Sequence, residues 1–294
     1  MTSPEEFKQI RRIHLLASRP AAGILAGEYR SSFKGKGIEF DELREYQPGD
    51  DIRNIDWNVT ARSSHPFVRR FVEERELTVM IMLDISPSLR FGTGQQLKSR
   101  RATEIVALLA GAALRNNDKV GLLLFTDRIE QYLPPQKGNR QLFKLIREAL
   151  FLKPAGRGTD IAGALEYLER VMKTTALLFL VSDCIAPEFS RPLMRAAARH
   201  DLVAIAMSDP AEIELPEAGV VMLEEAETGE KFLVDTGNPR TRSCYRHAGK
   251  LLREKVRAGF HRAGADFMEI TPGSSCYQTL VGFFRQRGRR VQRR

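Results

Sequence analysis

Acidic and hydroxyl side chains directly follow two apolar runs of this sequence. The run at residues 79–83 stops at Asp84, and Ser86 and Ser88 come immediately after it. A second apolar run, in TALLFLVSDC, places Asp183 at its own end. Both patterns put polar oxygen atoms where a buried strand ends, which makes these residues candidates for a binding site.

The segment GRGTD adds a third source of oxygen atoms. It presents Thr159 and Asp160 at the start of the helix that leads into the second strand. Ligands of open α/β sheets bind beyond the carboxyl ends of the strands. If the strands that end at Asp84 and Asp183 are neighbours, those ends lie about 4.8 Å apart. Three loops then direct oxygen atoms into one small volume.

These residue types favour a hard divalent cation. Carboxylate and hydroxyl oxygens without imidazole or thiolate suit Mg²⁺ first, with Mn²⁺ or Ca²⁺ as alternatives, rather than zinc or copper. Each element alone also has a structural explanation: an Asp-x-Ser turn before proline, a helix cap at Thr159 or Asp160, and a carboxylate at Asp183 that accepts backbone donors. Their occurrence together at corresponding strand ends favours the metal site.

The elements that would position this site alternate between short apolar runs and longer amphipathic runs. That alternation predicts an α/β fold, a Rossmann-like doubly wound and mostly parallel sheet with helices on both faces. The predicted strands are 77–83, 120–125, 175–181, 202–207 and 266–270. The predicted helices are 98–117, 139–152, 161–173, 190–200 and 244–264. A hairpin insertion at about 217–237 is expected to turn at Glu227–Glu230.

The motifs DISPS, GTD and SDC, in this order, resemble the metal-ion-dependent adhesion site of a von Willebrand factor type A domain. The resemblance implies that Ser86 and Ser88 bind the metal directly and that Thr159 binds it directly or through water. It also implies that Asp84 and Asp183 hold the water molecules of the cation. Asp160 is the less certain member of this set.

The upstream segment GIEFDELREYQPGDDIRNIDWNVTAR resembles the signature of the bacterial family called domain of unknown function 58. The resemblance extends from about Gly27 to Arg287. It implies a partner of MoxR-type AAA+ ATPases that acts in assembly or activation of other proteins and has no enzymatic activity. A client protein would offer a carboxylate to the cation. Longer members carry membrane helices ahead of this signature, and the short segment before it here predicts a form without a membrane span.

The first 76 residues form a predicted family-specific extension before the von Willebrand factor A-like domain at 77–287. Their opposite charges could clamp the segment to the sheet or form a partner-docking face, because exposed ion pairs contribute little stability each. Trp57 is expected to anchor the segment to the core. The candidate docking residues are Glu42, Arg44, Asp50, Arg53, Asp56 and Arg62.

Composition restricts the remaining function classes. The net charge of +9 comes largely from residues 285–294, which hold six arginines and no acid. We expect these six arginines to have no opposing acids and residues 288–294 to form a frayed basic tail. Nucleic-acid association through this tail is the alternative to protein binding. The sequence has no long apolar run and no signal-type start, and its three cysteines are widely spaced, which predicts a cytoplasmic protein.

A catalytic alternative is a metal-dependent phosphotransferase or phosphatase, in which a strand-end aspartate attacks phosphorus. That design usually places a second acid two residues later, where this chain has Ser86. No GxSxG elbow is present for a serine hydrolase. The histidines all lie away from the strand-end motifs in sequence; they are His14, His65, His200, His247 and His261. We therefore expect no enzyme.

Overall fold

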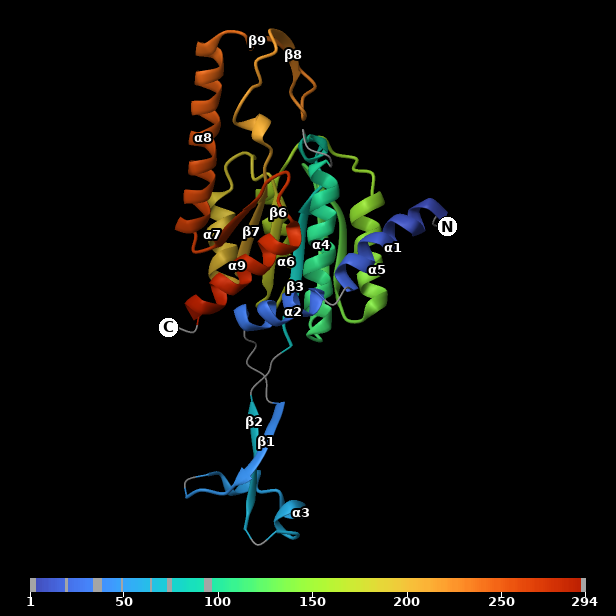
Figure 1. Cartoon of the computed structure of the whole chain (residues 1–294), viewed down its shortest axis with the longest axis vertical. Helices are drawn as coiled ribbons and strands as arrows, with labels where there is room; N and C mark the ends of the chain where they lie inside the picture. Colours follow the sequence, from blue (N-terminus) through green and yellow to red (C-terminus); the bar gives the residue numbers. More distant parts are fainter. Residues whose placement is uncertain are drawn as a thin grey trace.

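The computed structural model describes residues 4–18, 21–33, 39–48, 50–63, 65–72, 76–92 and 97–291. Its body is a mixed α/β fold around a six-stranded sheet in the order β10-β7-β6-β3-β4-β5 (Figure 1). The strands are β3 (Thr78–Asp84), β4 (Lys119–Phe125), β5 (Ile129–Gln136), β6 (Leu177–Ser182), β7 (Asp201–Met207) and β10 (Asp266–Ile270). All neighbours pair in parallel except β4 and β5, which confirms the mostly parallel sheet predicted from the sequence.

The edge strand β5 is absent from the sequence-based prediction. Its sequence, IEQYLPPQ, contains two prolines and several polar residues and is mostly half-buried, so it lacks the apolar run that marks the other strands. The strand nevertheless pairs closely with β4. A Cβ atom at Gly121 would lie 2.8 Å from the Leu133 carbonyl oxygen, and the strand register is irregular at this point. Glycine therefore permits the close approach of the edge strand.

Helices cover both faces of the sheet. One layer contains α1 (Pro4–Ser18), α2 (Ala21–Ser32), α4 (Lys98–Arg115), α5 (Asn139–Phe151) and α9 (Cys276–Val291). The other layer contains α6 (Ile161–Val171), α7 (Ser190–Arg199) and α8 (Pro239–Arg262). Alternate residues of β3 serve the two layers: Ile81 and Leu83 pack in the first, whereas Met80 and Met82 pack in the second.

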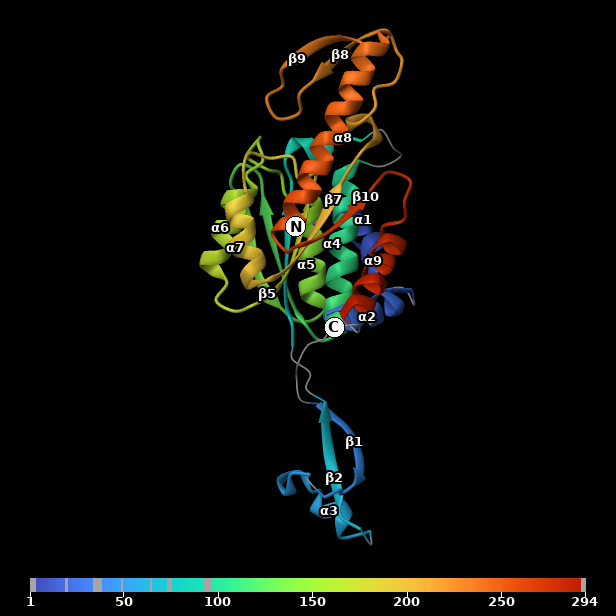
Figure 2. The same cartoon turned by 90° about the vertical axis from the view of Figure 1, so that its left-hand side faces the viewer.

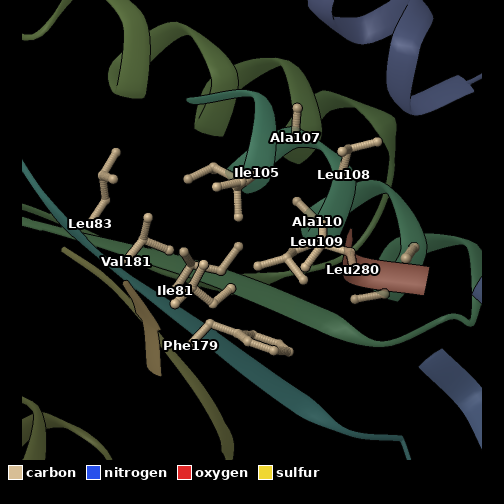
Figure 3. Packing of buried hydrophobic residues seen from close by; sticks show 14 of the residues in the cluster. Ile81, Leu83, Ile105, Ala107, Leu108, Leu109, Ala110, Phe179, Val181 and Leu280 are labelled. Carbon is tan, nitrogen blue, oxygen red and sulfur yellow. The ribbon is translucent and has the colours of Figure 1, made fainter. Parts of the chain in front are cut away.

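Helix α4 is buried along most of its length because the sheet lies beneath it and other helices of its layer cover it. Figure 3 shows Ile105 and Leu109 of this helix above Ile81 and Phe179 of the sheet, with Leu280 of α9 alongside. Full burial of an aliphatic side chain contributes about 1.5–3 kcal/mol. This packing fixes the strands whose ends carry the candidate site.

The first 76 residues divide into two parts. Helices α1 and α2 belong to the body, where α2 packs against α4 and α9. In contrast, β1 (Glu39–Glu45) and β2 (Phe67–Val72) form an antiparallel pair with η1 (Ile52–Asn54) and α3 (Trp57–Thr60). We call residues 39–72 the arm. Figures 1 and 2 show that the arm projects from one end of the sheet. The prediction for Trp57 is wrong, since its side chain is 65% exposed on the arm.

The C-terminal arginines do have opposing acids, contrary to the prediction from the sequence. Helix α9 continues to Val291, and Arg287 forms ion pairs with Asp201 at 2.5 Å and with Asp266. The Arg287 guanidinium also lies 4.4 Å from the centre of the Phe33 ring. Only tertiary structure brings these acids, from the starts of β7 and β10, to the helix. Residues 292–294 lie outside the described part of the chain.

We predict that Arg287→Ala lowers the free energy of unfolding by about 1–2 kcal/mol, because it removes charged hydrogen bonds that are partly exposed. Truncation after Arg287 keeps that side chain and should change stability by less. Urea unfolding of both variants checks this difference. A truncated protein that is as unstable as the Arg287→Ala variant would show that the last helical turn, and not Arg287, holds α9.

A buried carboxylate joins the N-terminal helices to the sheet. Asp118 accepts hydrogen bonds from the Tyr29 hydroxyl of α2 at 3.0 Å and from the Leu77 amide at 2.9 Å. Burial raises the pKa of Asp118 from 3.8 to about 6, although both hydrogen bonds oppose that rise. Ionisation of this group therefore disfavours the folded state.

We predict that Asp118 makes the protein less stable as the pH rises from about 4 to about 6, because the folded state holds the proton more tightly than the unfolded chain. Asp118→Asn removes this titration and keeps one acceptor. The unfolding free energies of both proteins should be measured across this range, and the difference between them should change with pH. Parallel profiles would contradict the assignment.

Candidate functional site

The strand register brings the predicted acidic strand ends together. Strand β3 lies between β4 and β6, where Asp84 pairs with Phe125 and Leu83 pairs with Val181. The Ser182 hydroxyl, at the end of β6, donates a 2.7 Å hydrogen bond to Asp84 Oδ2. The neighbouring strands that the sequence analysis required are therefore present, and Asp183 follows Ser182 at the same edge.

Asp84 is nearly inaccessible to solvent, with 1% of its surface exposed. Its second oxygen, Oδ1, accepts a 2.8 Å hydrogen bond from the Ser86 amide. Burial, followed by repulsion from the charge of Asp183, raises the pKa of Asp84 from 3.8 to about 7, against the opposing effect of these hydrogen bonds. Burial and the neighbouring Asp183 therefore disfavour the charged form of Asp84 unless a positive charge lies beside it.

The two predicted serine ligands lie side by side. Ser86 precedes the short helix η2 (Pro87–Arg90), and its side chain is fully buried. The Ser86 and Ser88 hydroxyl oxygens are 2.9 Å apart. Adjacent oxygens on an octahedral Mg²⁺ with bonds of about 2.1 Å are separated by about 2.9–3.0 Å. The spacing of these hydroxyls therefore fits two neighbouring positions around that ion.

Thr159 reaches the same edge through the loop before α6. The Asp160 amide donates a 2.9 Å hydrogen bond to the carbonyl of Thr126, which directly follows the end of β4. Gly156 of this loop permits a close approach, because a Cβ atom there would collide with the Thr126 hydroxyl. The Asp160 side chain accepts a 2.8 Å hydrogen bond from the Gly163 amide and caps α6, which gives it a structural role.

Glu130 of β5 holds this loop in place. One of its oxygens accepts hydrogen bonds from the Thr126 hydroxyl at 2.8 Å, the Ala155 amide at 3.0 Å and the Gly156 amide at 2.7 Å. Burial alone would raise the pKa of Glu130, but these donors outweigh it and the pKa is lowered. Sequence patterns did not indicate this role, since β5 itself was not predicted.

We predict that Glu130→Ala costs about 1–2 kcal/mol of stability, because it leaves three donors without their acceptor. Hydrogen exchange should accelerate at residues 155–160 in particular. Glu166→Ala serves as the control, since Glu166 forms an exposed ion pair with Arg195 and should contribute less than about 1 kcal/mol. Unchanged protection of the loop in Glu130→Ala would mean that other contacts hold Thr159.

Asp183 is oriented by an unusual backbone conformation. The next residue, Cys184, has a positive φ of 62°, which is uncommon for a residue with a side chain. The Ser182 hydroxyl accepts from the Cys184 amide at 3.0 Å, and Asp183 Oδ1 accepts from the Ile185 amide at 3.1 Å. These bonds hold the turn, so the Asp183 carboxylate stays at the sheet edge.

A buried lysine, which the sequence analysis did not identify, lies beside Asp183. The Lys98 ammonium at the start of α4 is 3.7 Å from Asp183 Oδ2 and donates a hydrogen bond to Glu212 of η3 (Pro210–Glu212). A separation of 3.7 Å is too long for a hydrogen bond. Glu212 is therefore the closer partner of Lys98, and Asp183 keeps an oxygen without a short contact to the ammonium.

A glutamate from the β8–β9 hairpin contacts the remaining predicted ligand. Strands β8 (Val220–Glu224) and β9 (Lys231–Asp235) pair with each other at the predicted position of the insertion. The Thr159 hydroxyl donates a 2.7 Å hydrogen bond to Glu227 Oε1 in the turn of this hairpin. The sequence marked Glu227 as a turn residue only, and the contact spans 68 positions of the chain.

The docking residues proposed on the N-terminal segment lie on the arm and not on the sheet. Arg44 forms a 2.6 Å ion pair with Asp50 inside the arm, whereas Arg53 and Arg62 are exposed. Asp56 is buried and caps α3 through two backbone amides. Glu42 lies in β1, but its side chain is outside the described residues. These contacts of Arg44, Asp50 and Asp56 lie within the arm and do not support the idea that the charges clamp it to the sheet.

The donor set fits a hard cation better than a soft one. Within the described residues, no three His, Cys, Asp or Glu side chains gather as metal ligands. The set at this edge has a different composition, with two carboxylates and three hydroxyls. All of these donors are oxygens, as Mg²⁺, Mn²⁺ and Ca²⁺ prefer. A cation beside the buried Asp84 would also favour the charged form of its carboxylate, which burial disfavours.

Comparison with known families identifies the group to which the sequence belongs. The family described as "Protein of unknown function DUF58" matches residues 42–255, from the arm to α8. The chain belongs to this DUF58 family. The match includes every residue of the candidate site, so the strand-end oxygens and the Glu227 hairpin lie inside the family region. The resemblance noted in the upstream segment is thereby confirmed.

Relatives match over nearly the whole DUF58 chain. An uncharacterized protein of Mycobacterium bovis is 31% identical over 97% of this chain and 91% of its own length. Among solved structures, BatB from Bacteroides thetaiotaomicron has a TM-score of 0.47 and 16% identity, covering 72% of this chain and 99% of its own. The SpRpn10 VWA domain has a TM-score of 0.41 and 11% identity, with coverages of 71% and 95%.

Proposed function

We propose that this DUF58 protein is a metal-dependent, non-enzymatic adaptor that binds other proteins through a cation at the carboxyl edge of its sheet. One observation carries the proposal. The buried Asp84 lies at one strand end with the paired hydroxyls of Ser86 and Ser88, next to the neighbouring strand end that bears Asp183. Mg²⁺ is the expected ion. Ser86, Ser88 and Thr159 would hold it, and Asp84 and Asp183 would hold its water molecules.

Charge around the site is distributed unevenly. Lys98 bonds to Glu212 and lies 3.7 Å from Asp183. The paired hydroxyls of Ser86 and Ser88 are neutral. The Lys98 ammonium therefore offsets part of the negative charge of Asp183 and Glu212, whereas Ser86 and Ser88 offer neutral oxygens. A cation bound by those neutral oxygens would still attract a carboxylate from another protein.

Neutral ligands explain why such a site would bind another protein and would not catalyse hydrolysis. A cation held mainly by hydroxyls keeps most of its charge and attracts a carboxylate from another protein. Asp84 is a poor nucleophile here, because both of its oxygens accept hydrogen bonds in a buried environment. The buried His200 accepts from the Ala176 amide beside the start of β7, at the opposite end of the strands from Asp84. These placements support binding over general-base catalysis.

The proposed partners follow from the family resemblance and from chemistry. A MoxR-type AAA+ ATPase is the expected partner, and a client protein would supply an Asp or Glu to the cation. The arm offers a second contact surface, with exposed Arg53 and Arg62. Figure 1 shows the arm at the end of the molecule away from the β8–β9 hairpin, so the two surfaces are well separated. Within the described residues, no helix combines the length and apolar character needed to cross a membrane.

We predict that Mg²⁺ raises the melting temperature of the protein. Binding to the folded state alone stabilises it by about 2.7 kcal/mol at a hundredfold excess over Kd. The double variant Ser86→Ala, Ser88→Ala keeps the strand and the charge, and should fold but lose this response. Differential scanning calorimetry with Mg²⁺ and then with chelator measures the effect. An equal rise in melting temperature in the double variant would show that the Ser86 and Ser88 hydroxyls do not bind the cation.

Calorimetric titration against a purified MoxR-type ATPase separates the two surfaces. The Ser86→Ala, Ser88→Ala variant should lose only the metal-dependent part of the affinity. Arg53→Glu on the arm should weaken binding equally with Mg²⁺ and with chelator. Full affinity of the wild-type protein in chelator would show that the cation takes no part in binding the ATPase. The client protein would then be the expected ligand of the cation.

A further inference from the structure

The contact between Thr159 and Glu227 suggests what occupies the cation site when no partner is bound. Thr159 is 5% exposed, and its hydroxyl is one of the proposed ligands. It donates to a carboxylate, which is the group that a partner is proposed to bring. A Cβ atom on the adjacent Gly158 would lie 3.7 Å from the second oxygen of Glu227. Both Glu227 oxygens therefore lie against the loop that carries Thr159.

The turn that presents Glu227 is held by its own hydrogen bonds. Glu225 accepts from the Glu227 amide at 3.2 Å and from the Thr228 amide at 2.6 Å through its side chain. The Gly229 amide donates to the Glu225 carbonyl at 2.9 Å, and Gly229 has a positive φ of 74°. These bonds lie within the turn itself, so its shape does not depend on the body, and the Glu227 side chain is left to face Thr159.

The hairpin that carries this turn buries little of its own surface. Val220, Met222, Phe232 and Leu233 are all more than half exposed. Figures 1 and 2 show the hairpin beyond the carboxyl edge of the sheet, beside the far end of α8. Segments with few buried apolar contacts open at the lowest free-energy cost. The hairpin can therefore leave the site while the sheet and its helices stay folded.

The charge of the proposed ligands explains why a carboxylate belongs there. Ser86, Ser88 and Thr159 are neutral, and Asp84 is already bonded to Ser86 and Ser182. A divalent cation gains affinity from each anionic ligand that it can reach. Among the described residues, Glu227 is the carboxylate outside the strand-end set that makes a hydrogen bond with a proposed ligand hydroxyl.

We propose that Glu227 is a built-in ligand of the cation, which the acidic side chain of a partner must displace. The inference rests on the proposed function and adds an internal competitor to it. The hairpin then limits partner affinity, since each binding event must first release Glu227 from the metal. Because the competitor is a carboxylate, the partner must also offer one. We expect an exposed Asp or Glu on a loop of the partner that can take the place of the hairpin beside the cation.

Mn²⁺ titrations of three proteins test this ligand. Glu227→Gln keeps the size of the side chain and a hydrogen-bond acceptor but removes the charge. Glu230→Gln makes the same change at an exposed position of the same hairpin, so it serves as the matched control. We expect Mn²⁺ to bind Glu227→Gln about tenfold more weakly than wild type, and Glu230→Gln to bind like wild type.

Water-proton relaxation of the Mn²⁺-saturated proteins gives the second readout. Loss of the Glu227 carboxylate opens a position for water, so relaxivity should be higher in Glu227→Gln than in wild type. Acetate, used as a carboxylate probe, should then lower the relaxivity of Glu227→Gln at concentrations that leave wild type unchanged. This difference measures the competition directly, without a partner protein.

The outcomes separate this inference from the proposed function. Equal Mn²⁺ affinity, relaxivity and acetate response in all three proteins would show that Glu227 is not a ligand, while the cation site would stand. Absence of Mn²⁺ binding in all three proteins would overturn the proposed function together with the competition. Equally weaker Mn²⁺ binding in both glutamine variants would show that the loss of negative charge in the turn, and not the loss of a ligand, lowers the affinity. That result would overturn the role of Glu227 as a ligand.

Discussion

The burial of the Asp84 carboxylate constrains the whole carboxyl edge of the sheet. Asp84 ends a strand that is paired on both sides. The hydrogen bonds that its carboxylate accepts come from the Ser86 amide and the Ser182 hydroxyl, and they offset part of the cost of burying it. With Asp183 nearby, the pKa of Asp84 rises to about 7. An apolar residue could end the strand without this electrostatic cost. A cation beside the carboxylate would favour its charged form, which connects the cost to the proposed site.

The α/β body separates two exposed parts of the molecule, the arm and the β8–β9 hairpin (Figure 1). Helices on both faces bury the sheet, and α1, α2 and α9 are packed into one of these layers. The arm projects from one end of this body, and the β8–β9 hairpin lies beyond the other (Figure 1). A partner that contacts both must span the length of the sheet. The proposed partner would have to be large to reach both surfaces. The hairpin can move without disturbing the core, because several of its apolar side chains are exposed.

Local sequence patterns were sufficient to specify the parallel sheet, because its central strands are continuous apolar runs and its helices have regular apolar spacing. They also specified the strand-end residues Asp84, Ser86, Ser88 and Asp183, whose types and order mark the ends of those strands. They did not reveal β5, whose prolines and polar residues hide an edge strand, nor the exposed position of Trp57. These depend on which surfaces neighbouring elements cover, and local sequence does not record that.

The folded arrangement of the chain determines which distant groups meet the strand ends. Lys98, Glu130 and Glu227 reach the site from a helix start, an edge strand and a hairpin turn, and each is an ordinary polar residue in its own segment. The acids that pair with Arg287 likewise come from the starts of other strands. Sequence spacing relates only residues that share one strand or one helix. The candidate ligands could still be grouped, because each marks the carboxyl end of an apolar strand or the start of a helix and such ends meet at one edge of a parallel sheet. The groups that hold or cover these ligands follow from how separate elements pack in space.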